Sequence, residues 1–520
     1  MIGEMLYPSN VSLLDTGLLL TTMLTVLFLI LSYELLTNNR RSRRRRFLEL
    51  SRKLPGPMPL PFIGNALKFA CKSKEMLNRL ETIIISHSTK EVPMKLWMGS
   101  ELYVVVTAPG DIEKVLNSQQ ACYKGRVYRF LHPFIGNGLI SGDGNMWRRH
   151  RKLLTYTMTQ KVLHGFVNIF DRHSRKLMDK LESQADGGYD FDIFPYIEAC
   201  TIDIVCEAVM GRLDVNAQDN ADQEIIHYTA KMYKIIFERM TKVWLQSDWI
   251  FNQTRYYTEQ QRGREVIQNF VHTCVSAKRN DQNYTPLLSS NQKSILEHLL
   301  ESLKSSSNSL TDSELQDEIY TVYIASQDTI ALISSFATLM LGMHHEAQEK
   351  ARKEIEEIFQ GEDEPLTSES LSQLKYLEAV IKETIRLFPI APFLIRHLRG
   401  ELPLENCILP EDCQVLIAAY VTHRSVDYWR EPKKFLPERF SAEESSTRHP
   451  YAFIPFSGGP MSCIGQKFAM TCLKVILANL LRCYRIDTTW QMSDLLLNAD
   501  ISVRSINGYR VSLKPHEKAA

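Results

Sequence analysis

The sequence predicts a mainly helical α+β protein, made of one large folded body and a separate N-terminal transmembrane helix. Apolar residues recur at steps of three and four over most of the chain after residue 143, which is the period of an amphipathic helix. Strand-like patterns are short and few. A continuous apolar stretch at 16–36 is long enough to cross a bilayer, about 30 Å as a helix. With 520 residues, 44% of them hydrophobic, the chain can bury a large core.

The N-terminal stretch is predicted to be a membrane anchor. Its one charged residue is Glu34, and an arginine cluster follows at 40–46. Positive charge after the span keeps that side cytoplasmic. A cleaved signal peptide would carry its positive charge ahead of a shorter apolar stretch. Two alternatives are less favoured. The apolar stretch could be a buried helix of a soluble protein, and the arginine cluster could be a nuclear-import patch. We expect an anchor at 1–37, with the rest of the chain on the cytoplasmic side.

A basic and proline-rich linker is predicted at 38–61, followed by one body at 62–520. Four prolines between residues 54 and 61 favour an extended, semi-rigid path. The chain has 61 Lys and Arg against 60 Asp and Glu, and its basic excess lies in the first 53 residues, so nucleic-acid binding is not expected. Its ten cysteines form no C-x-x-C pair, which indicates buried thiols in a reducing compartment.

The body is predicted to be rich in helices with a minor β portion. A strand pair is expected at 95–106 around a turn at Gly99 and Ser100. A serine-rich connection is expected at 285–310, with a short helix-periodic piece at 295–303. Further strands are expected at 391–398, at 414–418 and around Asn507 and Gly508. Helices are expected at 144–183, 190–211, 222–244, 259–279, 312–343, 345–359 and 371–388.

The strongest functional signal is a cysteine in a glycine-rich loop. Cys463 lies in the run FSGGPMSCIG at 456–465, directly before a helical stretch that begins at Gly465. Unpaired N–H groups and the dipole at a helix N-terminus stabilise a thiolate. Gly459 and Gly465 allow close approach of a large flat cofactor, and Phe456 is placed to shield the sulfur from water. Such a sulfur suits an iron ligand or a nucleophile, whereas the loop alone is also compatible with an inert buried cysteine.

A long helix with a polar notch is predicted in the middle of the chain. Thr311 and Glu314 have the spacing of a capping box, and about 30 helical residues follow. Ser326 and Thr329 can each donate a hydrogen bond to the carbonyl four residues earlier, which bends a helix and opens a notch. Asp328 places an acid beside the Thr329 alcohol. Alone, such a pair is more often structural.

Two further spacings are weaker signals. Glu383 and Arg386, three apart, share one face of a predicted helix. Trp147 and Arg151, four apart, share a face of another, and Arg396 is a third candidate for binding an anion.

In this order the motifs resemble the cytochrome P-450 family of haem-thiolate monooxygenases, whose proximal loop reads F-x-x-G-x-x-x-C-x-G. The resemblance covers about residues 55–515 and implies the cytochrome P-450 fold, with body 62–520 as the catalytic domain. It implies Cys463 as the ligand of haem iron, with Phe456, Gly459 and Gly465 beside the haem. It also implies that Asp328 and Thr329 relay protons on the distal side. Trp147, Arg151 and Arg396 would hold the haem propionates, and Glu383 and Arg386 would lock to Arg439.

The resemblance is nearest to the family-4 branch, through residues 127–140 and 150–155, and to membrane-bound members. It implies oxidation of a fatty acid, steroid or xenobiotic with electrons from an NADPH-dependent reductase, possible support from cytochrome b5, and the endoplasmic reticulum membrane. Residues 123–146, 225–249, 390–395 and 504–507 are expected to border the substrate cavity. Some branch members bind haem covalently through a glutamate, but Ala325 stands at that position, so no such bond is expected.

Two departures from the family pattern keep alternatives open. Met461 stands where a cation usually faces a propionate, and the loss of one charge-assisted hydrogen bond would cost about 1.5–3 kcal/mol of haem binding. Ser326 stands where glycine is usual. One alternative is a degenerate, non-catalytic haem-binding membrane protein. Another is a haem-thiolate peroxide isomerase that needs no reductase, against which Asp328 and Thr329 argue.

Overall fold

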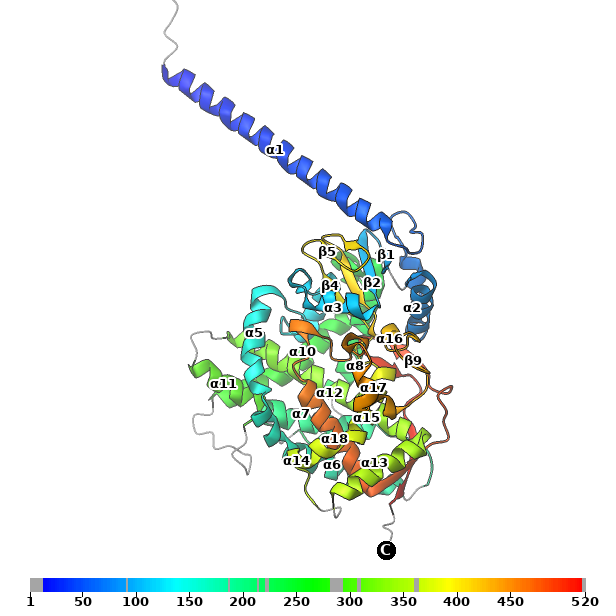
Figure 1. The fold of residues 1–520 in the computed structure, drawn as a ribbon. Helices are drawn as coiled ribbons and strands as arrows, with labels where there is room; N and C mark the ends of the chain where they lie inside the picture. The colour runs from blue at the N-terminus through cyan, green and yellow to red at the C-terminus, as the bar shows by residue number, and fades with distance from the viewer. Residues whose placement is uncertain are drawn as a thin grey trace, which may run out of the picture.

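A long N-terminal helix extends from a helix-rich body that has a small β region beside the junction (Figure 1). The computed structural model describes residues 13–89, 92–185, 188–212, 215–219, 224–280, 293–305, 310–359 and 364–516. The predicted class, α+β and mainly helical, is confirmed. Most of the predicted connection at 285–310 lies outside the described residues, but its short helical piece is present at Ile295–Ser305.

The helices follow the predicted periodic segments closely. The central helix, α12, spans Asp312–Met343 and begins at the predicted capping box of Thr311 and Glu314. The segment predicted at 144–183 is two helices, because the chain turns at 158–159. The longer helices are α1 (Leu13–Lys53), α2 (Ser73–His87), α3 (Pro109–Asn117), α5 (Gly144–Thr157), α6 (Gln160–Ala185), α7 (Phe194–Met210), α8 (Glu224–Thr241), α10 (Arg255–Asn280), α11 (Ile295–Ser305), α12, α13 (His345–Ile358), α15 (Lys375–Leu387) and α18 (Gln466–Cys483). Short helices are α4 (His132–Ile135), α9 (Asp248–Phe251), α14 (Ser368–Gln373), α16 (Ala419–Thr422) and α17 (Ala442–Ser446).

The main sheet has the strand order β1-β2-β7-β4. The predicted strand pair at 95–106 is confirmed, because β1 and β2 pair antiparallel on either side of Gly99 and Ser100. Strand β7 runs parallel to β2 and antiparallel to β4. The strands of this sheet are β1 (Met94–Met98), β2 (Glu101–Val106), β4 (Leu394–His397) and β7 (Gln414–Ile417).

The strands around Asn507 and Gly508 form no hairpin with each other. Strand β10 pairs with β9, while β11 pairs with β3 and β8. The Asn507 side chain donates to the Asp494 carbonyl at 2.8 Å and so ties the turn to the β9 side. The remaining strands are β3 (Phe191–Asp192), β5 (Leu402–Pro403), β6 (Ile408–Leu409), β8 (Tyr484–Asp487), β9 (Leu497–Ala499), β10 (Val503–Ser505) and β11 (Arg510–Pro515).

Helix α12 lies at the centre of the body and packs against α7, α18 and α15. In the part of the chain that was searched, it is the one helix long and apolar enough to span a membrane, but 83% of its apolar stretch is buried in the body. Its apolar character is therefore that of a core helix, and it forms a long wall through the middle of the molecule.

Helix α1 includes the apolar stretch predicted as an anchor. It continues without interruption to Lys53, so residue 37 lies inside one helix. Its far part extends away from the body (Figure 1), and Leu24, Leu27 and Phe28 are exposed there. Its near end is attached to the β region, where Arg46 pairs with Glu401 at 3.0 Å.

Candidate functional site

The loop before α18 presents Cys463 at the N-terminus of that helix. The Cys463 amide donates to the Phe456 carbonyl at 2.8 Å, which closes the loop. Helix α18 begins at Gln466, one residue later than predicted, and the N–H groups of Gly465 and Gln466 donate to the sulfur. These are the unpaired donors that a helix start offers. Many protein atoms surround Cys463, but its side chain remains accessible to solvent. The sulfur therefore borders a space that no protein atom fills.

Glycine is required at one position of this loop. Gly459 has φ of +64°, and a Cβ atom there would lie 2.2 Å from the Leu116 carbonyl oxygen. Gly465 is different, because the nearest heavy atom to its ideal Cβ is the Cys463 sulfur at 4.0 Å. The protein itself therefore leaves room beside Gly465, on the side where the sulfur lies.

A largely apolar cavity separates this loop from the central helix. Ile464 and Gly465 lie on one wall, and Ala325, Ser326 and Thr329 of α12 lie on the other. The cavity is closed elsewhere by Leu139, Ile140, Met158, Val209, Ile295, Thr321, Val322, Ile330, Phe468 and Ala469. An apolar slot between a cysteine loop and a long helix has the chemistry to hold a flat, hydrophobic cofactor.

The notch in α12 has the predicted hydrogen bonds. Ser326 donates to the Val322 carbonyl at 2.5 Å, and Thr329 donates to the Ala325 carbonyl at 2.7 Å. Thr329 lies on the cavity wall, whereas the neighbouring Asp328 is 3% exposed and faces the other way. The predicted acid and alcohol are thus adjacent in sequence but face different surroundings.

Asp328 is held by the C-terminal part of the chain. Arg504 Nη2 donates to Asp328 Oδ1 at 2.6 Å, and Ser502 Oγ donates to Oδ2 at 3.3 Å. The sequence placed Arg504 near the substrate cavity, but no local pattern indicated that it pairs with Asp328.

A group of cations gathers beside the cysteine loop without acidic partners. Arg151 of α5 donates to the Ser462 carbonyl at 2.6 Å, which places it next to Cys463. Arg396 of β4 is 3% exposed, and its guanidinium lies 3.5 Å from Ser457 Oγ. Lys124 joins Arg396 through an antiparallel β-bridge. Among the described residues, none of the three cations has a carboxylate within ion-pair distance.

The sequence reasoning missed Lys124, since only the folded chain brings it to Arg396. Burial, together with the charges of Arg396 and Arg151, lowers the pKa of Lys124 to about 7. An anion bound among these three cations would relieve the repulsion that Arg396 and Arg151 exert on Lys124, so the site is suited to an anion. Trp147, predicted to belong here, is buried on α5 one turn before Arg151.

The thiol of Cys463 responds to opposing influences. Burial raises the pKa of Cys463, whereas the Gly465 and Gln466 N–H groups and the Arg151 charge lower it. Met461, two residues earlier, is 8% exposed and packs in the hydrophobic core. It adds no charge to this side of the loop.

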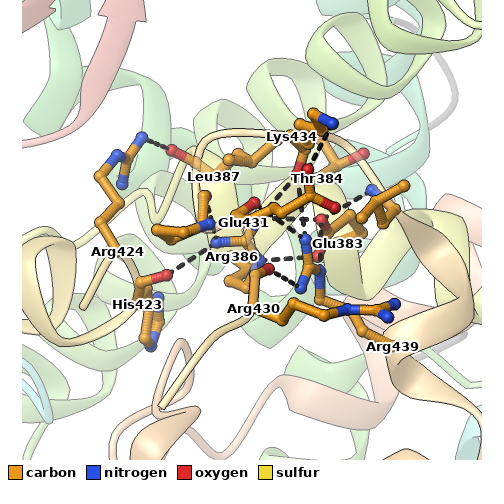
Figure 2. Close-up of polar contacts among 12 residues, drawn as sticks. Glu383, Thr384, Arg386, Leu387, His423, Arg424, Arg430, Glu431, Lys434 and Arg439 are labelled. Carbon is orange, nitrogen blue, oxygen red and sulfur yellow. Dashed lines mark hydrogen bonds and ion pairs between the residues drawn. The ribbon is translucent and has the colours of Figure 1, made fainter. Parts of the chain in front are cut away.

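A buried ionic network supports the segment that leads into the cysteine loop (Figure 2). Glu383 accepts from Arg386 Nε and Nη2 at 2.7 and 2.8 Å, and from Arg439 Nε at 3.0 Å. All three side chains are at most 2% exposed. The predicted lock between Glu383, Arg386 and Arg439 is therefore present.

The same network is connected to the cysteine loop through His423 and the Ile454 amide. Arg386 donates to the His423 carbonyl at 2.8 Å, and the His423 ring accepts from the Ile454 amide at 3.0 Å. Burial lowers the pKa of His423 to about 3, so the ring is neutral and can accept. Ile454 lies two residues before Phe456, where the cysteine loop begins.

Comparison with known proteins identifies the family of the chain. Residues 54–510 match the family model described as Cytochrome P450. The chain belongs to the cytochrome P450 family. It is 32% identical to Cytochrome P450 4c3 of Drosophila melanogaster over 505 residues, which cover 94% of this chain and 93% of that protein. It is 32% identical to Cytochrome P450 4V2 of Mus musculus, over 87% of this chain and 88% of that protein. For Cytochrome P450 4c21 of Blattella germanica the identity is 33%, over 88% and 91%.

Membership makes this protein a P450 monooxygenase with haem-thiolate iron, in a family that typically receives NADPH electrons through a reductase. The residues present fit that cofactor. The sulfur at a helix N-terminus suits ferric iron, the slot between α18 and α12 is apolar, and the cations without acidic partners suit carboxylates such as propionates.

Proposed function

We propose that this P450 inserts one oxygen atom of dioxygen into a fatty acid, steroid or xenobiotic, using electrons from an NADPH-dependent reductase. One observation carries the proposal: Ile464 and Gly465, which directly follow Cys463, and Thr329 of α12 line a single apolar cavity. Thiolate ligation on one side and an alcohol on the other are what oxygen activation by haem needs from the protein.

The haem, when bound, would supply dioxygen activation, and the thiolate of Cys463 would hold its iron. The N–H groups of Gly465 and Gln466 stabilise the negative sulfur, and Arg151 adds a positive charge nearby. Phe456 and Gly459 fix the loop, through the Phe456 carbonyl that receives the Cys463 amide and the left-handed backbone at Gly459. The sulfur is thereby held in position before the cofactor arrives.

The propionates would be bound by Trp147, Arg151, Arg396 and Lys124. Met461 brings no charge to this region, and Lys124 provides a cation from another segment. Met461 therefore does not favour the degenerate, non-catalytic alternative, since Arg151, Arg396 and Lys124 could supply the positive charge instead.

Thr329 and Asp328 would pass protons toward the distal face of the haem. Thr329 presents its hydroxyl at the cavity wall, and Asp328 stands behind it in an ion pair with Arg504. Retention of both groups favours a monooxygenase over a peroxide isomerase, which requires no proton delivery to dioxygen.

Membrane attachment fits a lipophilic substrate. Residues 1–37 would anchor the protein in the endoplasmic reticulum membrane, 38–61 would link the anchor to the body, and 62–520 would form the catalytic domain on the cytoplasmic side. The projecting helix α1, with exposed Leu24, Leu27 and Phe28, supports this arrangement. The NADPH-dependent reductase, and cytochrome b5 as a second electron donor, would act from the same side.

The test reconstitutes the full-length protein with a reductase and lipid vesicles. NADPH consumption should rise with a panel of fatty acids, steroids and xenobiotics, and hydroxylated product should appear for at least one class. Conversion of lipid peroxides without NADPH, and no NADPH-dependent product, would instead support the isomerase.

A further inference from the structure

Two carboxyl groups and one guanidinium share a buried site behind the α12 wall of the cavity. Asp328 comes from α12, Glu198 from α7 and Arg504 from β10. Arg504 pairs with Asp328 at 2.6 Å, and its Nε also donates to Ser502 Oγ at 3.2 Å. One cation is therefore committed to one of the two acids.

Glu198 is connected to the same helix turn through an amide. Gln327 Nε2 donates to Glu198 Oε1 at 3.4 Å, and Gln327 is the residue before Asp328. The Glu198 side chain is only half-buried, whereas Asp328 is 3% exposed. Glu198 is thus the more solvent-accessible of the two acids.

The other titratable side chains near Arg504 and the two carboxyl groups are neutral or acidic. Tyr233 of α8 lies 5.2 Å from the Arg504 guanidinium, measured to its ring centroid, and its hydroxyl donates to the Ile324 carbonyl. Tyr509 and Asp500 also face Arg504. Burial raises the pKa of both phenols, against a smaller lowering by Arg504, so they stay neutral.

Acids outnumber the one cation here, since Asp500 also faces Arg504, so the site is suited to hold one exchangeable proton near neutral pH. Burial first, and then repulsion from Asp328, raise the pKa of Glu198 to about 7, against a smaller lowering by Arg504. Glu198 is thus poised to gain and lose a proton in the physiological range.

We propose that Glu198 is the proton-holding positioning residue that reloads Asp328 during turnover, with Arg504 steadying whichever carboxylate is charged. In this step the Glu198 carboxyl O–H bond breaks and the proton moves to a carboxylate oxygen of Asp328, where a new O–H bond forms. Asp328 becomes neutral, Glu198 becomes a carboxylate beside Arg504, and Glu198 then takes a new proton from bulk water. No electrons move, and the net charge of the trio is unchanged. The inference rests on the proposed proton role of Asp328 and Thr329.

The experiment compares E198Q with wild type in the full-length, reductase-coupled protein, with the exposed Glu182 changed to Gln as a charge-matched control. Wild-type product per NADPH should fall as pH rises through about 7, because the donor loses its proton there. In E198Q the ratio should be lower by about 10²-fold, with more hydrogen peroxide and no inflection, since a positioned proton donor is worth about 10²-fold or more. E198D should regain a pH-dependent ratio, and E182Q should match wild type.

A second measurement needs no turnover. Infrared spectra of the wild-type protein should show a protonated carboxyl band that shifts in D₂O, disappears as pH rises through about 7, and is missing in E198Q. The inference is overturned if this band is absent from wild type, or if E198Q keeps the wild-type ratio and pH profile.

The absorbance spectrum of the reduced, carbon monoxide-bound protein distinguishes failure of the Glu198 role from failure of the proposed function. If wild type gives a thiolate-type spectrum and E198Q keeps the wild-type product ratio and pH profile, only the proposed role of Glu198 is refuted. Absence of that spectrum in folded wild-type protein refutes the proposed function on which the role of Glu198 rests.

Discussion

Removing the Glu383 carboxylate should destabilise the protein strongly, because it leaves two buried guanidinium groups without their counter-charge. Glu383 is fully buried and receives hydrogen bonds from Arg386, Arg439 and the Leu436 amide. Loss of one partner from a buried ion pair costs about 3–5 kcal/mol. Both arginines keep backbone carbonyl acceptors, as Figure 2 shows for this cluster, so the lower part of that range is expected for E383A.

The assay is urea unfolding of the holoprotein followed by tryptophan fluorescence, because Trp429 lies 5.0 Å from the Arg386 guanidinium. The matched control is E349A, whose carboxylate is 55% exposed and 3.9 Å from Arg352, with an expected effect below about 0.5 kcal/mol. The E383A/R439A double variant should lose less than the sum of the single losses, by about 0.5–3 kcal/mol. An E383A loss within about 1 kcal/mol of the control would refute the argument that this network supports the cysteine loop.

Three further predictions follow from other parts of the molecule. K124Q should release haem to apomyoglobin about 10-fold faster than wild type or the exposed-site control K152Q, since a charge-assisted hydrogen bond is worth about 1.5–3 kcal/mol. Equal release rates would show that Lys124 does not bind a propionate. G459A should lower haem incorporation and the urea midpoint of unfolding far more than the control G188A. Both glycines have positive φ, but of the two only Gly459 has backbone, the Leu116 carbonyl oxygen, within 2.2 Å of the added Cβ, and similar losses would contradict this steric argument. Removing residues 1–37 should shift the protein from the carbonate-resistant membrane fraction to the soluble or peripheral fraction, whereas full retention in the resistant fraction would argue against the anchor.

The helices and the cysteine loop were predictable because their signals are local. The capping box of Thr311 and Glu314, the three- and four-residue steps of α12, and the spacing from Phe456 to Gly465 are each complete within one segment of sequence. Even the back-bonds of Ser326 and Thr329 involve only carbonyls of the same helix. Such features persist wherever the segment lies in the fold.

Partners between distant segments were not predictable in the same way. Lys124 reaches Arg396 only through a β-bridge, and Asp328 reaches Arg504 only after β10 returns to the central helix. The turn at Asn507 is recognisable from its local sequence, but its flanking strands pair with β9, β8 and β3, and a local turn signal does not select such partners. The pairing of Glu383 with Arg439 was reached through family resemblance and not through spacing, because the two residues lie on different elements.

The most direct test of the central claim is the absorbance spectrum of the reduced, carbon monoxide-bound, full-length protein, compared between wild type and C463S. Wild type should give the red-shifted Soret band of haem-thiolate ligation, because Cys463 directly precedes the cavity residues Ile464 and Gly465 and its sulfur accepts from the Gly465 and Gln466 N–H groups. C463S should lose that band while remaining folded. A thiolate-type band that persists in C463S, or its absence from folded wild-type protein, would contradict the assignment of Cys463 as the ligand of haem iron.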